Sequence, residues 1–453
     1  MVSVRALVAP AYLFACLVLG GSAQGIWQNM LLQLAGLAII AWAALDADGD
    51  PITPAARQLL LLVIAFVAIV LLQTIPLPAA AWAHLGPRER LAEGFHALRL
   101  SPPSEPLSLA PAAGLSTLFA IIPPIALLCA MVRLRAYRAQ LLAIALIVGV
   151  VAGIVLGTLQ VASSNPELSP WYLYEDTNPG KAVGFFANAD HMASLLVVTI
   201  PFIGAIIAAG RHANLQRYSA IIAVAVAVAI VVIVGIALNG SLAGYGLALP
   251  VIAASALIII PRRSLLRVWV IGASFLLMIG TIVALEMTPI GSGKIGSHAT
   301  SAVQSRSEIL STTVQAARDF MPFGSGLGSF QSIYPLYEKP EQVTPIYVVH
   351  AHNDYVEIAL ELGAAGIVLL LAFLAWWFIA VWRVVCAAER RPFARAAAIA
   401  SAAILIHSLV DFPLRTAAIS ACFAMCLALL ADSRTTQVRN KDDELRPMRH
   451  LVI

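Results

Sequence analysis

Residues 348–377 read VVHAHNDYVEIALELGAAGIVLLLAFLAWW and join two kinds of sequence. The first half contains histidines, an asparagine and carboxylates, whereas the second half contains no charged residue. An apolar helix of about 17–25 residues is long enough to cross ~30 Å of hydrocarbon. Ionisable groups in such a helix are energetically unfavourable unless they face the bundle interior or a wet cavity. The stretch therefore predicts a membrane helix that begins at a polar site.

The composition extends this prediction to the whole chain. Of its 453 residues, 60% are hydrophobic and only 11% are charged, against roughly a quarter charged in soluble domains. The apolar runs are continuous rather than alternating, which excludes an outer-membrane barrel. We predict an all-α polytopic membrane protein with about twelve transmembrane helices, at 5–22, 26–45, 59–75, 114–132, 139–161, 188–209, 218–238, 241–260, 267–285, 355–381, 395–411 and 415–431.

Lysine and arginine predict the orientation, because cytoplasmic segments carry an excess of both. With the N-terminus inside, 19 of the 28 lie on the cytoplasmic side. Three tight clusters, VRLRAYR, PRRSLLR and ERRPFAR, all fall on that side. We therefore expect both termini to be cytoplasmic, residues 1–431 to form a single integral-membrane domain, and residues 432–453 to form a polar cytoplasmic tail.

The largest outer loop is predicted at about 286–354, before the tenth span. A connection of ~70 residues is far longer than ordinary loops, and such loops are functional or disordered. Its middle part, RSEILSTTVQAARDF at 306–320, has apolar residues at helical spacing. We therefore expect the loop to be partly helical and periplasmic.

The polar end of the tenth span contains the residues best suited to chemistry. Asn353, Glu357 and Glu361 are spaced i, i+4, i+8 and so share one helix face. Asn353 or Asp354 can cap the helix, and Asn353 and Glu357 are expected to bind substrate. His350 and His352 do not form a metal pair by this pattern, since i and i+2 do not face each other on a helix and no third ligand follows. No metal or other cofactor is expected.

These residues also resemble a known family. His352-Asn353, nine residues, Gly363, two residues and Gly366 look like the signature of the O-antigen ligase and Wzy polymerase superfamily. Other segments are similar to motifs of the family in the same order: GFFANADHMASLLVVTIPF, FMPFGSGLGSFQSIYPLY and IHSLVDFPLR. The early loop LQTIPLP…EPLSLAP also has the look of the family, so the resemblance covers most of positions 70–430.

The resemblance implies a multi-pass enzyme of the bacterial inner membrane with its active site on the periplasmic face. Such enzymes move glycan from undecaprenyl pyrophosphate to an acceptor without a metal. The resemblance makes His352 the catalytic base and Arg306 the residue that contacts the pyrophosphate. Imidazole suits proton abstraction near neutral pH, and arginine presents a permanent fork of donors to phosphate oxygens. No nucleic acid is expected as a partner.

One position departs from the family pattern. Family members commonly carry a Ser-Arg pair after the seventh span, but this chain reads LNGSLAGYG, with Leu242 in the place of the arginine. Either another cation substitutes or this member is specialised or impaired. Arg318 and Arg415 are the candidates for the missing charge.

Further polar residues are candidates for the substrate cavity, and each also has a structural alternative. His407, Asp411 and Arg415 are spaced i, i+4, i+8. The His-Asp pair is either a structural hydrogen bond inside the bundle, which we favour, or part of the glycan cavity, and Arg415 is expected to bind substrate. Asn188, Asp190 and His191 form either a polar helix start or a wall of the lipid-glycan pocket. GSGLG at 324–328 lacks the ending of a nucleotide P-loop and predicts a tight turn under the loop.

The acceptor remains open at this point. An O-antigen ligase would transfer glycan to lipid A–core, a Wzy-type polymerase to the next lipid-linked repeat, and a protein O-oligosaccharyltransferase to serine or threonine. The spacing of the His-Asn-Gly-Gly pattern favours the ligase. A lipid-glycan flippase or transporter is the alternative from another class, but the polar residues gather on one side rather than at mid-membrane.

Overall fold

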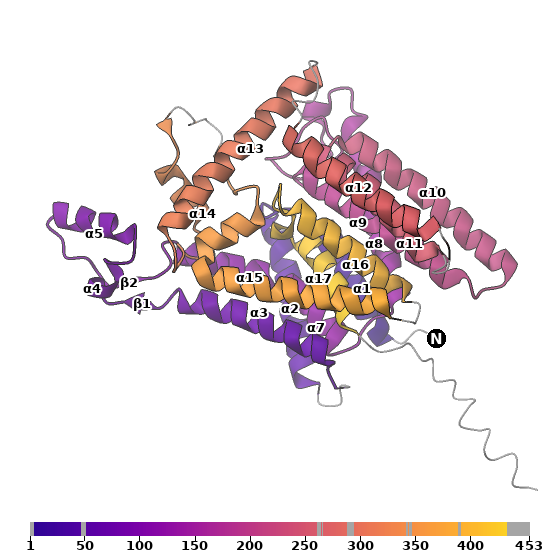
Figure 1. The fold of residues 1–453 in the computed structure, drawn as a ribbon, viewed down its shortest axis with the longest axis horizontal. Coiled ribbons are helices and arrows are strands. Elements are labelled where there is room, and N and C mark those ends of the chain that lie inside the picture. The colour runs from indigo at the N-terminus through magenta and orange to yellow at the C-terminus, as the bar shows by residue number, and fades with distance from the viewer. Residues whose placement is uncertain are drawn as a thin grey trace, which may run out of the picture.

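The computed structural model of this chain is built almost entirely of helices (Figure 1). The two strands, β1 (Pro76–Leu77) and β2 (Glu105–Pro106), are two residues long and pair antiparallel. The structure describes residues 4–46, 51–260, 264, 266–287, 294–340, 343, 347–387 and 391–432. The predicted tail lies outside the described residues except for Asp432.

The helices follow one another in the order predicted from the apolar runs. They are α1 (Val8–Leu19), α2 (Ile26–Leu45), α3 (Pro54–Leu72), α4 (Ala79–Trp82), α5 (Arg88–Ala97), α6 (Pro111–Ala120), α7 (Ile122–Val132), α8 (Ala139–Val161), α9 (Ala189–Gly210), α10 (Leu215–Asn239), α11 (Leu242–Ile259), α12 (Leu266–Met287), α13 (Lys294–Asp319), α14 (Phe330–Ile333), α15 (Asp354–Cys386), α16 (Pro392–His407) and α17 (Ala417–Ala431). Short 3₁₀ turns lie at Val4–Leu7, Pro166–Leu168, Tyr334–Leu336 and Pro413–Arg415.

The fold class predicted from the sequence is confirmed. Within the described part of the chain, eight helices are long and apolar enough to cross a membrane: α2, α3, α6 with α7, α8, α9, α10, α11 and α15. Three further apolar helices are shorter, at Val4–Leu19, Pro392–His407 and Ala417–Ala431. Each of the twelve predicted segments falls on one of these helices or on α12. The chain is a polytopic helical membrane protein.

Helices α9, α16 and α17 form the centre of the bundle. Helix α9 packs against α8, α10, α11 and α16, and α17 packs against α1, α7 and α16. Nearly every residue of α17 is buried, and the small side chains of α16 let the helices approach closely. Small residues at helix contacts are typical of membrane bundles, where packing rather than the hydrophobic effect drives association.

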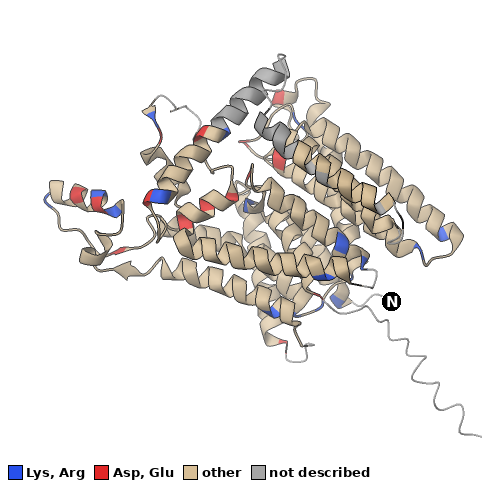
Figure 2. Ribbon diagram, viewed as in Figure 1, with Lys and Arg blue, Asp and Glu red and all other residues tan. Residues whose placement is uncertain are grey.

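The helix ends define two ends of the bundle. At one end, Arg5 pairs with Asp46 at 2.7 Å, and the Tyr137 hydroxyl donates to Asp432. At the other, Ala418 N–H donates to the carbonyl of Gly20. Figure 2 shows arginines and lysines along the end that carries the N-terminus, whereas most acidic residues lie toward the opposite end, at α5, α13 and the start of α15.

The early loop forms an arm that projects from the acidic end of the bundle (Figure 1). Its base is held by Arg88, whose side chain is buried. The guanidinium donates to the carbonyls of Leu107 and of Gly324 and lies over the Phe320 ring at 5.5 Å. Burial lowers the pKa of Arg88 to about 10. The arm is thereby tied to the Gly-rich segment of the large loop.

The large loop between α12 and α15 contains real secondary structure. Helix α13 covers the segment predicted to be helical, and α14 follows it. Residues 288–293, 341–342 and 344–346 lie outside the described residues. The prediction of a partly helical loop before the tenth span is confirmed for its middle part.

Helix α15 is interrupted at Gly363, whose φ of 59° and ψ of −146° are not helical. The Gly-rich segment 324–328 fills the interruption: Ser325 N–H donates to the carbonyl of Leu360, and Gly326 N–H to that of Glu361. A Cβ on Gly324 would lie 2.4 Å from the Glu361 oxygen, so only glycine fits there. The GSGLG segment, predicted to form a tight turn, therefore donates main-chain hydrogen bonds to carbonyls of α15 at the point where the helix is interrupted.

The eleventh predicted span is corrected by the structure. The predicted helix at 395–411 ends at His407, and Asp411 lies in the turn that follows. Pro413 and the residues before it cannot continue the helix, since proline lacks the N–H donor and restricts the preceding residue. Asp411 and Arg415 therefore do not share a helix face with His407.

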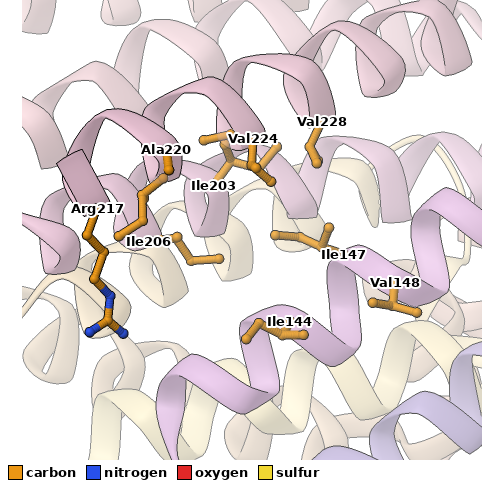
Figure 3. A pocket seen from close by; sticks show the side chains of 11 residues that line it. Ile144, Ile147, Val148, Ile203, Ile206, Arg217, Ala220, Val224 and Val228 are labelled. Carbon is orange, nitrogen blue, oxygen red and sulfur yellow. The ribbon is translucent and has the colours of Figure 1, made fainter.

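Two apolar grooves open on the sides of the bundle. The first, of about 330 Å³, lies between α3, α7, α15, α16 and α17. The second, of about 460 Å³, lies between α8, α9 and α10 near the end that carries the N-terminus (Figure 3).

Candidate active site

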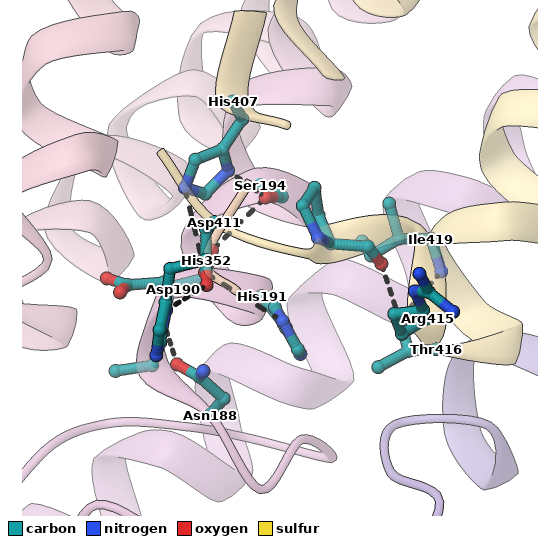
Figure 4. A network of polar contacts seen from close by, with 12 residues as sticks. Asn188, Asp190, His191, Ser194, His352, His407, Asp411, Arg415, Thr416 and Ile419 are labelled. Carbon is teal, nitrogen blue, oxygen red and sulfur yellow. Dashed lines mark hydrogen bonds and ion pairs between the residues drawn. The ribbon is translucent and has the colours of Figure 1, made fainter. Parts of the chain in front are cut away.

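The centre of the polar end is Asp411, whose side chain is completely buried. Its Oδ1 lies 3.2 Å from Nδ1 of His352, and its Oδ2 lies 3.8 Å from Nε2 of His191 and 4.0 Å from Nε2 of His407 (Figure 4). We call these four residues the histidine–aspartate cluster. They come from four separate places in the chain: the start of α9, the loop just before α15, the end of α16 and the following turn.

Asp411 is held as an anion by its surroundings. Burial raises its pKa, but the hydrogen bond with His352 and the electrostatic effects of His191, His407 and Arg306 outweigh burial and hold the pKa below the usual range of an aspartate. His407 is fixed on its other side by the Ser194 hydroxyl, 2.5 Å from Nδ1. The carboxylate is therefore a permanent charge under the imidazole of His352.

His352 is the most exposed of the three histidines. Its side chain is 24% exposed, whereas Asp411 is buried. Its backbone φ is +52°, a conformation that a residue with a side chain rarely adopts and that is often found at functional sites. With Nδ1 turned to the carboxylate, Nε2 is left to face the outside of the cluster. A proton on Nδ1 makes Nε2 an acceptor, which is the arrangement of a general base.

Asn353, the residue after His352, caps α15 and so holds the loop end in place. Its side chain accepts hydrogen bonds from the N–H groups of Tyr355 and Val356 and donates to the carbonyl of Leu409. The prediction that Asn353 caps the helix is confirmed. The cap holds the start of α15 against the turn that carries Asp411.

Arg306 reaches the same end from α13. Its Nη2 lies 2.8 Å from Oδ2 of Asp190, whose Oδ1 accepts from the Ser241 hydroxyl at 2.6 Å. Burial lowers the pKa of Arg306, but the charges of Asp190 and Asp411 outweigh burial and raise it. The guanidinium is 33% exposed. It is a stable cation with donors left to offer, positioned beside the residue that precedes Leu242.

A second ionic network lies around Arg415. Its guanidinium is 3.0 Å from Glu357, 3.5 Å from Asp354 and 3.8 Å from Glu361. Glu357 also accepts from the N–H of Ala351 and pairs with His350 at 2.9 Å. We call Arg415, Asp354, Glu357, Glu361 and His350 the arginine–carboxylate cluster.

Phe412 separates the two clusters. Its ring centroid lies 5.0 Å from that of His352, 5.2 Å from His191 and 4.4 Å from His350. The ring is an apolar wall between them, while the backbone of residues 350–354 joins them. Figure 4 shows Arg415 beside Thr416 and Ile419, apart from the histidines.

Not every predicted residue is brought together. Arg318 lies exposed on α13, twelve residues and roughly 18 Å of helix beyond Arg306. Asn188 caps α9 by accepting from the N–H of Asp190. The structure thus gives Asn188 a local role, places His191 against Asp411, and places Glu357 against Arg415.

Some residues of the site were not among those predicted from the sequence. Asp190 pairs with Arg306, Asp411 is the hub, and His350, expected to be a bystander, contacts Glu357. The signal for Asp190 was its position next to His191, and that for Asp411 its spacing from His407. Neither spacing shows that Asp190 meets Arg306, 116 residues later, or that Asp411 meets His352, 59 residues earlier.

The groove of about 330 Å³ begins beside these clusters. Its lining is apolar except at one end, where Asp354, Tyr355 and Ser408 contribute. Within the described residues, no group of three or more His, Cys, Asp or Glu is placed to hold a metal ion. Of the residues of the two clusters, Asp354 is the one that lines the groove.

The fold and this site define a class: a polytopic helical membrane protein with a buried ionisable cluster at one end of its bundle. Residues 227–371 match the O-antigen ligase family, Wzy_C. This match supports the resemblance of the chain to the O-antigen ligase and Wzy polymerase superfamily. The matched segment includes Arg306 and His352. A comparison with curated proteins finds no relative of this chain.

Proposed function

We propose that the protein transfers glycan from undecaprenyl pyrophosphate to an acceptor hydroxyl, and that it is an O-antigen ligase with lipid A–core as the acceptor. The match to this family implies lipid-linked glycans as substrates and a ligase or polymerase type of membrane glycosyltransferase. The observation that carries the proposal is the buried Asp411 carboxylate beneath the partly exposed imidazole of His352.

In the proposed reaction, Nε2 of His352 takes the proton of the acceptor hydroxyl as its oxygen attacks the anomeric carbon. The bond from that carbon to the pyrophosphate oxygen breaks, and undecaprenyl pyrophosphate leaves with the electron pair. Asp411 stabilises the imidazolium that forms. Well-placed general bases contribute about 10²–10⁴-fold in rate.

Arg306 is the proposed partner of the departing pyrophosphate. Negative charge grows on the leaving group, and a cation fixed in advance stabilises it without rearrangement. Arg306 is partly exposed and held by a single carboxylate. It stands beside Ser241, where the family pattern has an additional arginine and this chain has Leu242.

Arg415, predicted from the sequence to bind substrate, is proposed instead to hold the structure together. Its guanidinium faces three buried carboxylates. Its donors are directed at those groups, and the surplus negative charge would repel a pyrophosphate. Glu357 is then part of the same brace.

The lipid carrier is proposed to enter sideways from the bilayer. The groove between α3, α7, α15, α16 and α17 is apolar along its length and polar at the end next to His352. A polyprenyl chain in this groove would bring its pyrophosphate to the polar end of the bundle, where Arg306 is the proposed cation that binds it. We further propose that this end is periplasmic in the inner membrane and that both termini are cytoplasmic, because the basic residues favour the opposite end.

The decisive experiment is rescue of a deletion strain with wild type, His352→Ala and the control His84→Ala, an exposed histidine of the arm. Smooth lipopolysaccharide should be restored by wild type and His84→Ala only, with polymer accumulating on undecaprenyl pyrophosphate in the His352→Ala strain. Loss of chain extension with single repeats on the core would make the protein a Wzy-type polymerase. Full rescue by His352→Ala would disprove the general base, and an unchanged glycan would point to protein glycosylation or lipid-glycan transport.

A further inference from the structure

The groove between α8, α9 and α10 is far from the candidate active site in chain and space. It lies near the start of α8, the end of α9 and the start of α10, which meet at the end of the bundle opposite the clusters. Its volume is about 460 Å³. Ten of the eleven lining side chains are apolar: Ile144, Ile147, Val148, Ile203, Ile206, Ala220, Ile221, Val224, Ala225 and Val228.

The remaining lining residue is Arg217, in the first turn of α10. Figure 3 shows its guanidinium at one end of the groove, pointing away from the apolar side chains. The residue is exposed, and within the described part of the chain its guanidinium has no acceptor. The cation is therefore available to a ligand.

The surroundings of Arg217 contain no acidic counter-charge of their own. The sequence has no aspartate or glutamate from residue 191 to residue 285, or from residue 133 to residue 166. These stretches include all of α8, α10 and α11 and all but the first turn of α9. The groove thus combines an apolar channel with a positive end, and no nearby carboxylate could bind an amine.

We propose that this groove binds an anionic phospholipid, with an acyl chain along α8 and α10 and the phosphate on Arg217. Basic positions between helices at a membrane surface attract anionic headgroups. A zwitterionic lipid would bring an ammonium group to a place that offers it no partner. The site lies in the opposite half of the bundle from the glycan site, so the proposal does not depend on the proposed function.

The test is lipid retention by the purified full-length protein. Wild type is delipidated in detergent, incubated with equal amounts of phosphatidylglycerol and phosphatidylcholine of the same chain length, and analysed by native mass spectrometry. One phosphatidylglycerol should be retained preferentially. Arg217→Gln should lower its retention about five-fold, the effect of one basic residue near an anionic surface, whereas Arg57→Gln, an exposed arginine in the first turn of α3, should not.

A second pair of variants tests the groove itself. Val224→Trp fills the groove and should abolish retention, while Val226→Trp, equally on α10 but outside the lining, should leave it unchanged. Equal retention of both lipids, or unchanged retention in Arg217→Gln, would overturn the proposal. So would preferential retention of undecaprenyl phosphate in the same assay, because the groove would then belong to the carrier.

Discussion

The histidine–aspartate cluster and the arginine–carboxylate cluster begin within two residues of each other, at His352 and His350, and yet are built differently. Around Arg415, one cation faces three buried carboxylates, and the partly exposed His350 is paired with one of them, Glu357. Around Asp411, one buried carboxylate faces three histidines, of which His352 is partly exposed. Both networks use the residue types that the sequence concentrates at the start of α15.

The two clusters differ in which group remains able to exchange a proton. An arginine held by several buried carboxylates fixes segments of the chain relative to one another, and breaking the network leaves charge without a partner. In the histidine–aspartate cluster the partly exposed group is an imidazole on a single buried carboxylate, and it can take up or release a proton while Asp411 stays in place. We therefore assign structure to the first cluster and chemistry to the second.

The largest expected effect is on stability, from Arg415→Gln. The change leaves three carboxylates buried together, and removal of one partner of a buried ion network costs about 3–5 kcal/mol. The purified variant should melt well below wild type in detergent. Arg318→Gln, an exposed arginine of α13, is the control and should change the free energy of unfolding by less than about 0.5 kcal/mol. A folded Arg415→Gln protein without transfer activity would mean that Arg415 acts on substrate and that our division is wrong.

Asp411→Asn should lower kcat for glycan transfer about 10²-fold or more with little change in KM. The amide keeps the shape of the side chain but cannot stabilise the imidazolium of His352, and a loss confined to the transition state appears in kcat. Steady-state kinetics on lipid-linked glycan would measure it. Asp176→Asn, in an exposed loop, provides the control, and an equal rise in KM with kcat preserved would argue for a binding role instead.

Arg306→Gln should lower transfer activity with little loss of stability, whereas Arg415→Gln should mainly lower stability. Its ion pair with Asp190 is partly exposed, so its loss should cost less than about 1 kcal/mol of stability. Transfer should fall about ten-fold or more, because the cation proposed to face the pyrophosphate is gone. Melting and transfer assays on the same preparation would show the contrast. Transfer at the wild-type rate would remove Arg306 from the site.

The smallest expected effect is the pH dependence of stability that Asp411 contributes. Its pKa in the folded protein lies below that of an unfolded aspartate, about 3.9. A depressed carboxylate stabilises the fold above the unfolded pKa, and this contribution is lost as the pH falls through the folded pKa. Wild type and Asp411→Asn should therefore differ in melting temperature at pH 6, and the difference should begin to narrow below about pH 4 and narrow further as the pH falls toward the folded pKa. A constant difference down to pH 3 would mean that the charge of Asp411 is not the stabilising feature.

Much of the fold was predictable, because continuous apolar runs report membrane helices directly. The helix at 306–319 and the cap at Asn353 followed from local patterns in the same way. The end of α16 at His407 was missed, since an apolar run continues past it into the turn before Pro413. A local pattern also cannot show the interruption at Gly363, because it depends on what packs against the helix.

The site was predictable only in part for the same reason. His352 stands out because it precedes a helix cap beside carboxylates, and residues 348–361 can be interpreted together. The partnership of Arg306 with Asp190, or of His352 with Asp411, joins segments far apart in the chain. Spacing along one helix placed Arg415 with Asp411, whereas the folded turn sends the two side chains into different clusters.

The contact between the Gly-rich segment and the interrupted helix is made largely by main-chain atoms. Hydrogen bonds between peptide groups do not depend on the identity of the side chains around them. The point at which α15 is interrupted is therefore set by glycines and peptide groups. A chain with this architecture needs glycine at these positions more than it needs any particular side chain beside them.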